Sequence, residues 1–135
     1  MYKHILIPTQ LDSTRDVAMA TTAAQQLLSD GGRITFLHVL EPLPASIGTY
    51  LPEGYPQETR DALKAKLDEL TATVPGSQAI LADGPAGRTI TNWADDNGVD
   101  CIAIPSHQPT FSDVFLGSTA AWVVKHAHCA VHVVR

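Results

Sequence analysis

The residues Gly117, Ser118 and Thr119 combine types that can bind a phosphate group. They open the segment 118–128, whose apolar residues recur at helical spacing. The first backbone N–H groups of a helix have no acceptor within the helix, and the helix dipole adds positive potential there. Glycine allows the backbone to come close, and the two hydroxyl groups add donors. The spacing alone fits either a phosphate site or an ordinary turn with a helix N-cap.

Two other groups of residues raise the question of a metal or a nucleophile. His126, His128 and His132 are close in sequence, but they run from a helix end into a strand, and no CxxC-like ligand pair accompanies them. The adjacent Ser106 and His107 lack the GxSxG turn of a nucleophilic serine. His107 fits better beside the phosphate turn, where its protonated form would attract an anion. We therefore expect no metal site and no catalytic residue.

Strand-like and helix-like segments alternate along the whole chain. We expect strands at 4–8, 33–40, 77–81, 101–104 and 130–134, and helices at 12–28, 57–70, 86–97 and 118–128, the first of these helices ended by Gly31 and Gly32. Such alternation predicts an α/β fold over a single domain, 1–135, with a doubly wound five-stranded parallel sheet and four helices. Ligands of such sheets bind beyond the carboxyl ends of the strands, where the strand order reverses. The segments 8–12, 38–42 and 105–118 can reach that place.

Composition and charge narrow the function classes. The 135 residues are 44% hydrophobic and carry a net charge of −5, which excludes a disordered chain and makes nucleic acid a poor partner. No apolar run approaches the roughly 20 residues of a membrane span, and no signal-peptide pattern opens the chain, so we expect a cytoplasmic protein without a membrane partner. Residues 41–56 hold four prolines and two glycines, which predicts a long loop of the kind that covers ligands.

The carboxyl-terminal run 104–135, IPSHQPTFSDVFLGSTAAWVVKHAHCAVHVVR, resembles the end of the universal stress protein family. Members typically end in a GSHG-like turn, an LLGS segment, a helix with an RHA-like end and a PVLVV-type strand. The opening MYKHILIPTQ and the turn at Gly84 are similar too, so the likeness covers the whole chain and points to the short, single-domain bacterial type. It implies a Rossmann-like, adenine nucleotide alpha hydrolase-like fold with strand order 3-2-1-4-5. Members are usually dimeric, and one branch binds ATP while another does not.

The resemblance also implies a nucleotide site. Its nucleoside contacts would be Pro8, Thr9, Gln10 and Val39, and its phosphate contacts Ser106, His107, Gly117, Ser118 and Thr119, for ATP or AMP with Mg²⁺ as a companion of the nucleotide. Three positions depart from the family's pattern. Gln10 replaces an aspartate, and Pro105 and Gln108 stand where ATP-binding members have glycines, in a shortened and glycine-poor form of the motif. Pro105 has no N–H to offer, and the Gln108 side chain crowds the approach.

These observations lead to one function and two alternatives. The last strand, Ala130–Val134, is expected at a sheet edge, and the resemblance implies a homodimer that pairs this edge across a two-fold axis. We predict a cytoplasmic universal stress protein that binds ATP or a related adenine nucleotide and acts as a dimeric sensor or regulator of the stress response. It would not be an enzyme, with at most slow ATP hydrolysis. A nucleotide-independent dimeric interaction protein stays open, as does, on fold analogy alone, a flavin or nucleotide-transfer enzyme.

Overall fold

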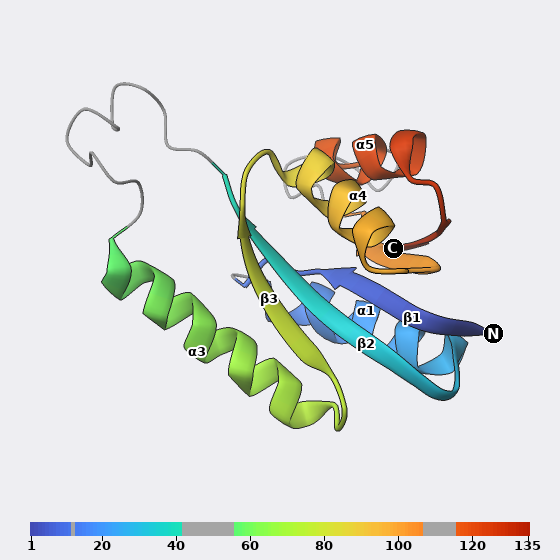
Figure 1. Cartoon of the computed structure of the whole chain (residues 1–135), viewed down its shortest axis with the longest axis horizontal. Helices are drawn as coiled ribbons and strands as arrows, with labels where there is room; N and C mark the ends of the chain where they lie inside the picture. The colour runs from blue at the N-terminus through green and yellow to red at the C-terminus, as the bar shows by residue number, and fades with distance from the viewer. Residues whose placement is uncertain (12, 42–55, 107–115) are drawn as a thin grey trace.

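Strands and helices alternate in the computed structural model (Figure 1), which describes residues 1–11, 13–41, 56–106 and 116–135. In these ranges the strands are β1 (Tyr2–Pro8), β2 (Leu28–Leu40), β3 (Gln78–Asp83), β4 (Cys101–Pro105) and β5 (Ala130–Val134). The helices are α1 (Thr14–Leu27), α3 (Gln57–Thr73), α4 (Ala86–Asp96) and α5 (Ser118–His126). The strands form a parallel sheet in the order β3-β2-β1-β4-β5. The predicted fold class and strand order are confirmed.

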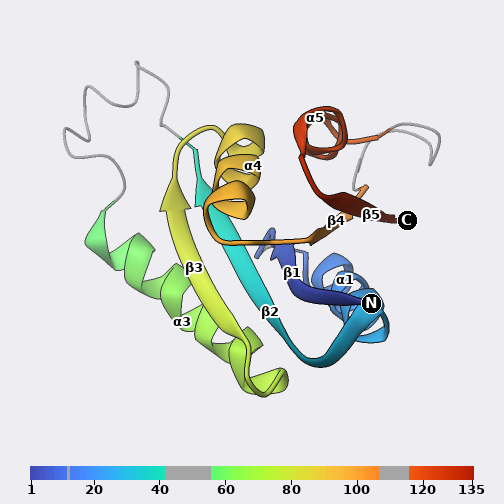
Figure 2. The ribbon, with the colours of Figure 1, turned by 45° about the vertical axis from the view of Figure 1, so that its right-hand side comes forward.

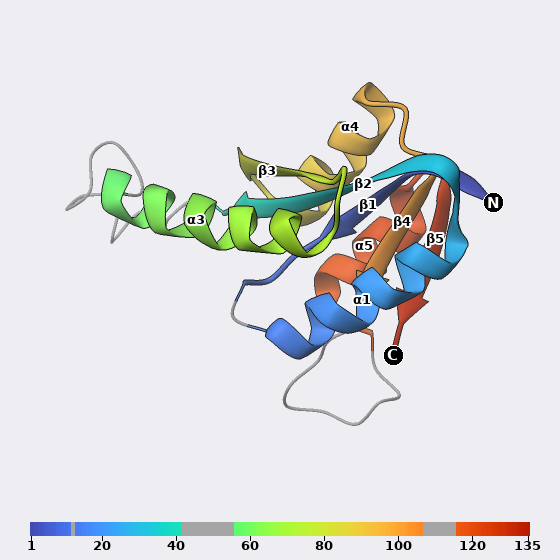
Figure 3. The same ribbon diagram turned by 90° about the horizontal axis from the view of Figure 1, so that it is seen from below.

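The helices cover both faces of the sheet. Figures 2 and 3 show α1 and α3 on one face and α4 and α5 on the other. Side chains of β1 alternate between the faces: Ile5 and Ile7 join the core cluster under α1 and α3, and Leu6 joins the one under α4 and α5. Phe36 and Leu37 of β2 divide in the same way. A strand buried on both faces needs apolar residues at nearly every position, which explains the apolar run at the start of the chain.

A buried polar cluster lies at the amino end of the sheet. His4 is only 3% exposed, and its Nε2 lies 2.8 Å from Oγ1 of Thr35. The Gln78 side-chain amide donates to the same Oγ1 at 3.0 Å, and Nδ1 of His4 donates to the carbonyl oxygen of Asn97 at 3.2 Å. Burial and the nearby Arg33 charge lower the pKa of His4, and together they outweigh the opposing effects of the Asn97 carbonyl and the Asp100 carboxylate. The imidazole is therefore held neutral.

The predicted first helix and second strand have the wrong boundary. The helix ends at Leu27, and β2 begins at Leu28, five residues before the predicted start at Arg33. The two glycines that were expected to end the helix lie within β2, where the register with β1 shifts between the pairs Tyr2↔Leu28 and His4↔Arg33. Gly31 has a φ of 77°, a conformation that favours glycine. The glycines thus mark an irregularity inside the strand instead of the end of the helix.

Candidate functional site

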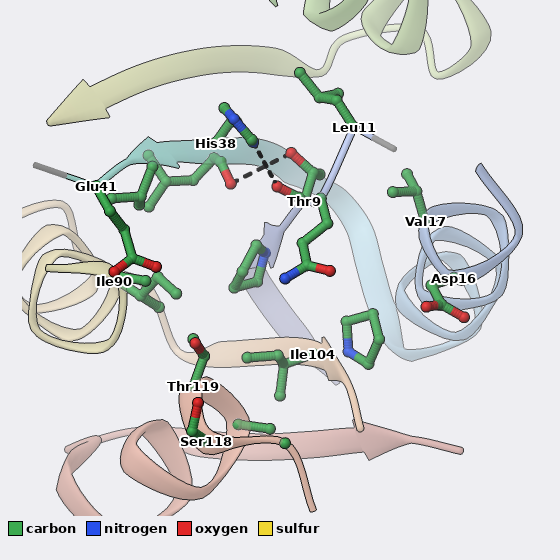
Figure 4. Close-up of a pocket in the computed structure, with 18 of the residues that line it drawn as sticks. Thr9, Leu11, Asp16, Val17, His38, Glu41, Ile90, Ile104, Ser118 and Thr119 are labelled. Atoms are coloured by element: carbon green, nitrogen blue, oxygen red, sulfur yellow. Dashed lines mark hydrogen bonds between the residues drawn. The ribbon is translucent and has the colours of Figure 1, made fainter. Parts of the chain in front are cut away.

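A pocket of about 640 Å³ lies at the carboxyl edge of the sheet. The ends of β1, β2 and β4 meet there, together with the amino ends of α4 and α5 and one side of α1 and α3. Figure 4 shows labelled side chains that follow β1 and β2 or belong to β4, α4 and α5 around the common space. This edge includes the boundary between β1 and β4. From that boundary the chain adds β2 and β3 on one side and β5 on the other, so the strand order reverses there. The pocket therefore lies where a doubly wound sheet binds its ligands.

The end of β1 forms a fixed floor of the pocket. Pro8 and Thr9 are buried, and the Thr9 N–H donates to the carbonyl oxygen of Leu37 at 2.8 Å. The Thr9 hydroxyl donates to the same oxygen at 3.4 Å, and Nδ1 of His38 lies 2.8 Å from the Thr9 carbonyl oxygen. A carbonyl oxygen can only accept, so Nδ1 carries the proton in this bond. Both backbone groups of Thr9 are thus engaged with β2, while Gln10, the next residue, is exposed.

An apolar slot adjoins this floor. Val39 near the end of β2 is half-buried, whereas Ile90 of α4 and Ile104 of β4 are nearly fully buried, and all three line the pocket. Pro8 and Pro105 complete the lining on the side of β1 and β4. Apolar side chains that meet around an open slot can hold a flat ring system by burial of its faces.

The amino end of α5 forms the polar side of the pocket. Gly117 is the N-cap with extended backbone, and its N–H donates to the carbonyl oxygen of Ser106 at 3.3 Å. No side-chain hydrogen bond from the described residues caps the helix. The N–H groups of Ser118, Thr119 and Ala120 belong to the first turn, which has no intrahelical acceptors, and all three residues line the pocket. Figure 4 shows the Ser118 and Thr119 side chains at this side. The arrangement can bind an anion.

The charged residues of the pocket are mostly acidic. Asp16 of α1 and Glu41 after β2 bring carboxylates, and Lys66 of α3 is the only lysine or arginine among the described lining residues. In Figure 4 the Glu41 side chain points toward Ile90 on the same side of the pocket as Thr119. Any anion seated at α5 therefore shares the pocket with carboxylates.

The pocket brings together most of the residues predicted from the sequence. Seven of them line it: Pro8, Thr9, Gln10, Val39, Gly117, Ser118 and Thr119. Ser106 is not among the lining residues, although its carbonyl oxygen accepts from Gly117. His107 and Gln108 fall outside the described residues, as do positions 42–55 of the predicted loop. Pro105, the departure from the glycine motif, does line the pocket.

Sequence reasoning missed several lining residues. His38 and Glu41 flank Val39 at the end of β2, so their position in a segment expected to reach the ligand was a usable signal. Lys66 gave no such signal, because it is one of several polar residues on a helix and its place depends on how α3 lies against the sheet. Asp16 likewise reads as an ordinary acidic residue in a first helical turn.

The histidines near the carboxyl terminus make other contacts. His126 stacks on the Trp122 ring, with ring centroids 3.8 Å apart, and its Nδ1 lies 2.9 Å from the Trp122 carbonyl oxygen. His128 Nδ1 lies 3.0 Å from a carboxylate oxygen of Asp95, on the surface. His132 is exposed on β5. Within the described ranges, no three His, Cys, Asp or Glu residues are grouped so as to hold a metal ion. Within the same ranges, no helix is long and apolar enough to cross a membrane.

Comparison with known proteins gives a consistent result. The model of the universal stress protein family matches residues 1–135. Universal stress protein G of Shigella flexneri is 29% identical over 143 aligned residues, which cover all of both chains. The structure of universal stress protein UspA from Lactobacillus plantarum superposes with a TM-score of 0.73 at 23% identity, covering 99% of this chain and 98% of that one.

Two solved structures of similar fold contain nucleotides. A universal stress protein in complex with cAMP has a TM-score of 0.68 at 15% identity, covering 99% of this chain and 97% of that one. A universal stress protein family member from Arabidopsis thaliana with AMP bound has a TM-score of 0.65 at 19% identity, covering 98% and 90%. At these identities the likeness establishes the shared fold. Because the family model matches the chain over its whole length, the chain belongs to the universal stress protein family.

Proposed function

We propose that the pocket at the carboxyl edge binds an adenine nucleotide, with the base in the apolar slot and a phosphate at the amino end of α5. The observation that carries this proposal is the meeting of both features in one pocket of about 640 Å³. The cAMP and AMP complexes of proteins with the same fold support it.

The residues at each end of the pocket suit the parts of a nucleotide. Val39 and Ile90 can pack against a purine ring, and the exposed Gln10 amide can both donate to and accept from its polar edge or the ribose. The Thr9 N–H and carbonyl oxygen already bond to β2, so they hold the floor in shape and leave recognition to neighbouring groups. Ser118 and Thr119 add hydroxyl donors to the N–H groups for a phosphate.

The wider role belongs to the same proposal. We infer a cytoplasmic regulator whose output is the occupancy of this pocket, with ATP hydrolysis slow at most. A homodimer through β5 is supported by its place at the end of the strand order, where it has a neighbour, β4, on one side only among the described strands. A second copy would satisfy the backbone groups on the open side.

Ligand analysis and calorimetry test the proposal. The ligand released from the purified protein is identified by absorbance and mass spectrometry, and AMP and ATP are then titrated by isothermal calorimetry. We expect an adenine signal or measurable binding. We also expect binding to be lost when Gly117→Val is combined with Ser118→Ala, because a side chain then fills the approach to the N–H groups and a hydroxyl donor is gone. Ser29→Ala, at the opposite edge of the sheet, is the matched control.

Three results would contradict the proposal. A yellow flavin spectrum would favour an enzyme on this fold. Absence of both a bound ligand and nucleotide affinity would favour the nucleotide-independent interaction protein. Unchanged affinity in the double variant, with circular dichroism showing a folded chain, would refute the placement of the phosphate.

A further inference from the structure

We infer that the pocket prefers an adenine nucleotide with a single phosphate group to the di- and triphosphates, and that Glu41 is the residue that sets this preference. The inference rests on the proposed function, because it concerns the same pocket. Its basis is the set of anion-binding groups that the described residues bring to the amino end of α5 and the sign of the charges around them.

The described donors at α5 suffice for about one phosphate group. The first turn offers the N–H groups of Ser118, Thr119 and Ala120 and two side-chain hydroxyls. The N–H of Gly117 is already bonded to Ser106, so it is not available. A terminal phosphate has three oxygen atoms that accept hydrogen bonds, and these five donors can satisfy them. A second and third phosphate would need donors from elsewhere.

The side chains of Pro105 and Glu41, which line the pocket near α5, add no donors for a further phosphate. Pro105 lines the pocket at the end of β4 and has no N–H. Glu41 follows β2 and is exposed, with its side chain directed to the side of Ile90 and Thr119 in Figure 4. A carboxylate there repels each further phosphate charge.

Positive charge is scarce around the pocket. Lys66 is the lysine that lines it, and the sequence contains no lysine or arginine between residues 34 and 59 or between 89 and 124. These stretches include every residue from the end of β2 to the start of α3 and from β4 through most of α5. Arg60 forms an ion pair with Asp83 at 2.8 Å, and Arg88 lies over the Trp122 ring. A triphosphate would thus find few cations to offset its charge.

The charge difference gives the size of the effect. Near pH 7.5 AMP carries close to two negative charges and metal-free ATP close to four. At a separation of several ångströms in a solvated pocket, removing one carboxylate changes the affinity for ATP by about three- to tenfold. The affinity for AMP changes less, because AMP carries about half the negative charge of ATP.

The experiment compares two substitutions that change the net charge equally. Glu41→Gln removes the pocket carboxylate, and Glu69→Gln removes an exposed carboxylate of α3 that does not line the pocket. Dissociation constants of adenosine, AMP, ADP and ATP are measured by calorimetry for the wild type and both variants, in EDTA and again with Mg²⁺. Thermal unfolding verifies that each variant is folded.

We expect AMP to bind at least as tightly as ATP in both buffers and more tightly than adenosine. We expect Glu41→Gln to shift the ATP-to-AMP affinity ratio toward ATP by about three- to tenfold in EDTA, while Glu69→Gln leaves that ratio unchanged. Tighter binding of ATP than of AMP to the wild type in either buffer overturns the inference but leaves the proposed function intact. Equal shifts in the two variants overturn the role of Glu41. A folded protein that binds no adenine nucleotide overturns the inference and the proposed function together.

Discussion

Replacing Thr35 with valine is expected to destabilise the fold without changing the pocket. Thr35 lies fully buried between His4 and Gln78. Because the His4 Nδ1 proton is used toward Asn97, Nε2 must accept, and the Thr35 hydroxyl donates to it while accepting from the Gln78 amide. Valine has nearly the same shape but no hydroxyl, so it leaves both of these partners without their bonds.

The size of the effect follows from burial. The His4 ring nitrogen is enclosed in the sheet and would lose its donor without access to water, which costs about 1–3 kcal/mol of unfolding free energy. The Gln78 side chain is on an exposed residue of β3 and can turn to solvent, so its loss adds little. A decrease of this size lowers Tm by roughly 3–10 °C in a domain of this length.

Urea unfolding followed by tryptophan fluorescence measures the change, since Trp93 packs edge-on against His4 with ring centroids 5.9 Å apart. The matched control is Thr22→Val, because the Thr22 hydroxyl is exposed and bonds only along its own helix to Ala18. We expect the control to stay within about 0.5 kcal/mol of the wild type. Equal free energies of unfolding for the Thr35 and Thr22 variants would refute the stabilising role of the buried hydrogen bonds between Thr35, His4 and Gln78. A change in AMP affinity in Thr35→Val would refute the expectation that the buried polar cluster acts independently of the pocket.

The buried polar cluster around His4 also makes the stability of the fold depend on pH. The pKa of His4 is lowered in the folded protein, so below the ordinary value of about 6.5 the unfolded chain binds a proton that the folded one resists. His4 therefore contributes stability that is present above that pH and is lost as the pH falls below it, with a slope of at most about 1.4 kcal/mol per pH unit. Between pH 7 and 5.5 the free energy of unfolding should change less with pH in His4→Gln than in the wild type, because glutamine has no proton to gain. An unchanged slope would contradict the assignment.

Three further substitutions give shorter tests. His38→Leu should weaken AMP binding by about three- to tenfold in calorimetry, because the Thr9 carbonyl loses its donor, whereas His38→Asn can restore an N–H and should recover much of the affinity. A glycine-to-alanine substitution normally stabilises a helix. In Gly87→Ala of α4, however, the new Cβ would lie 2.4 Å from the Trp122 ring, so we expect the free energy of unfolding in urea to fall by about 1–3 kcal/mol. In the proposed homodimer the centre of β5 would meet its own copy across a two-fold axis, so we expect His132→Asp to shift the dimer toward monomer in sedimentation and His132→Asn to leave it unchanged.

The sequence predicted the parts of the site that depend on strand order alone. Pro8, Thr9 and Val39 end or follow apolar strands, and parallel strands bring such ends to one edge whatever the packing of the helices. Lys66 could not be predicted in this way, because its position depends on the rotation of α3 about its own axis. The start of β2 could not be predicted either, because a pair of glycines can mark the end of a helix or an irregularity within a strand.

The departures from the family's glycine motif take on a different meaning once they have a place in the fold. In the sequence alone, Pro105 is equally compatible with a lost nucleotide site and with an altered one, because its missing N–H says nothing about the donors that remain. In the structure Pro105 lines the same pocket as Ser118 and Thr119, whose first-turn N–H groups have no acceptor within the helix. Among the described residues, the pocket keeps these donors for one phosphate, and Pro105 and Glu41 in its lining add no side-chain donor for a second. The departures therefore bear on how many phosphates the proposed ligand carries, and the affinities of AMP and ATP, compared by calorimetry, test this.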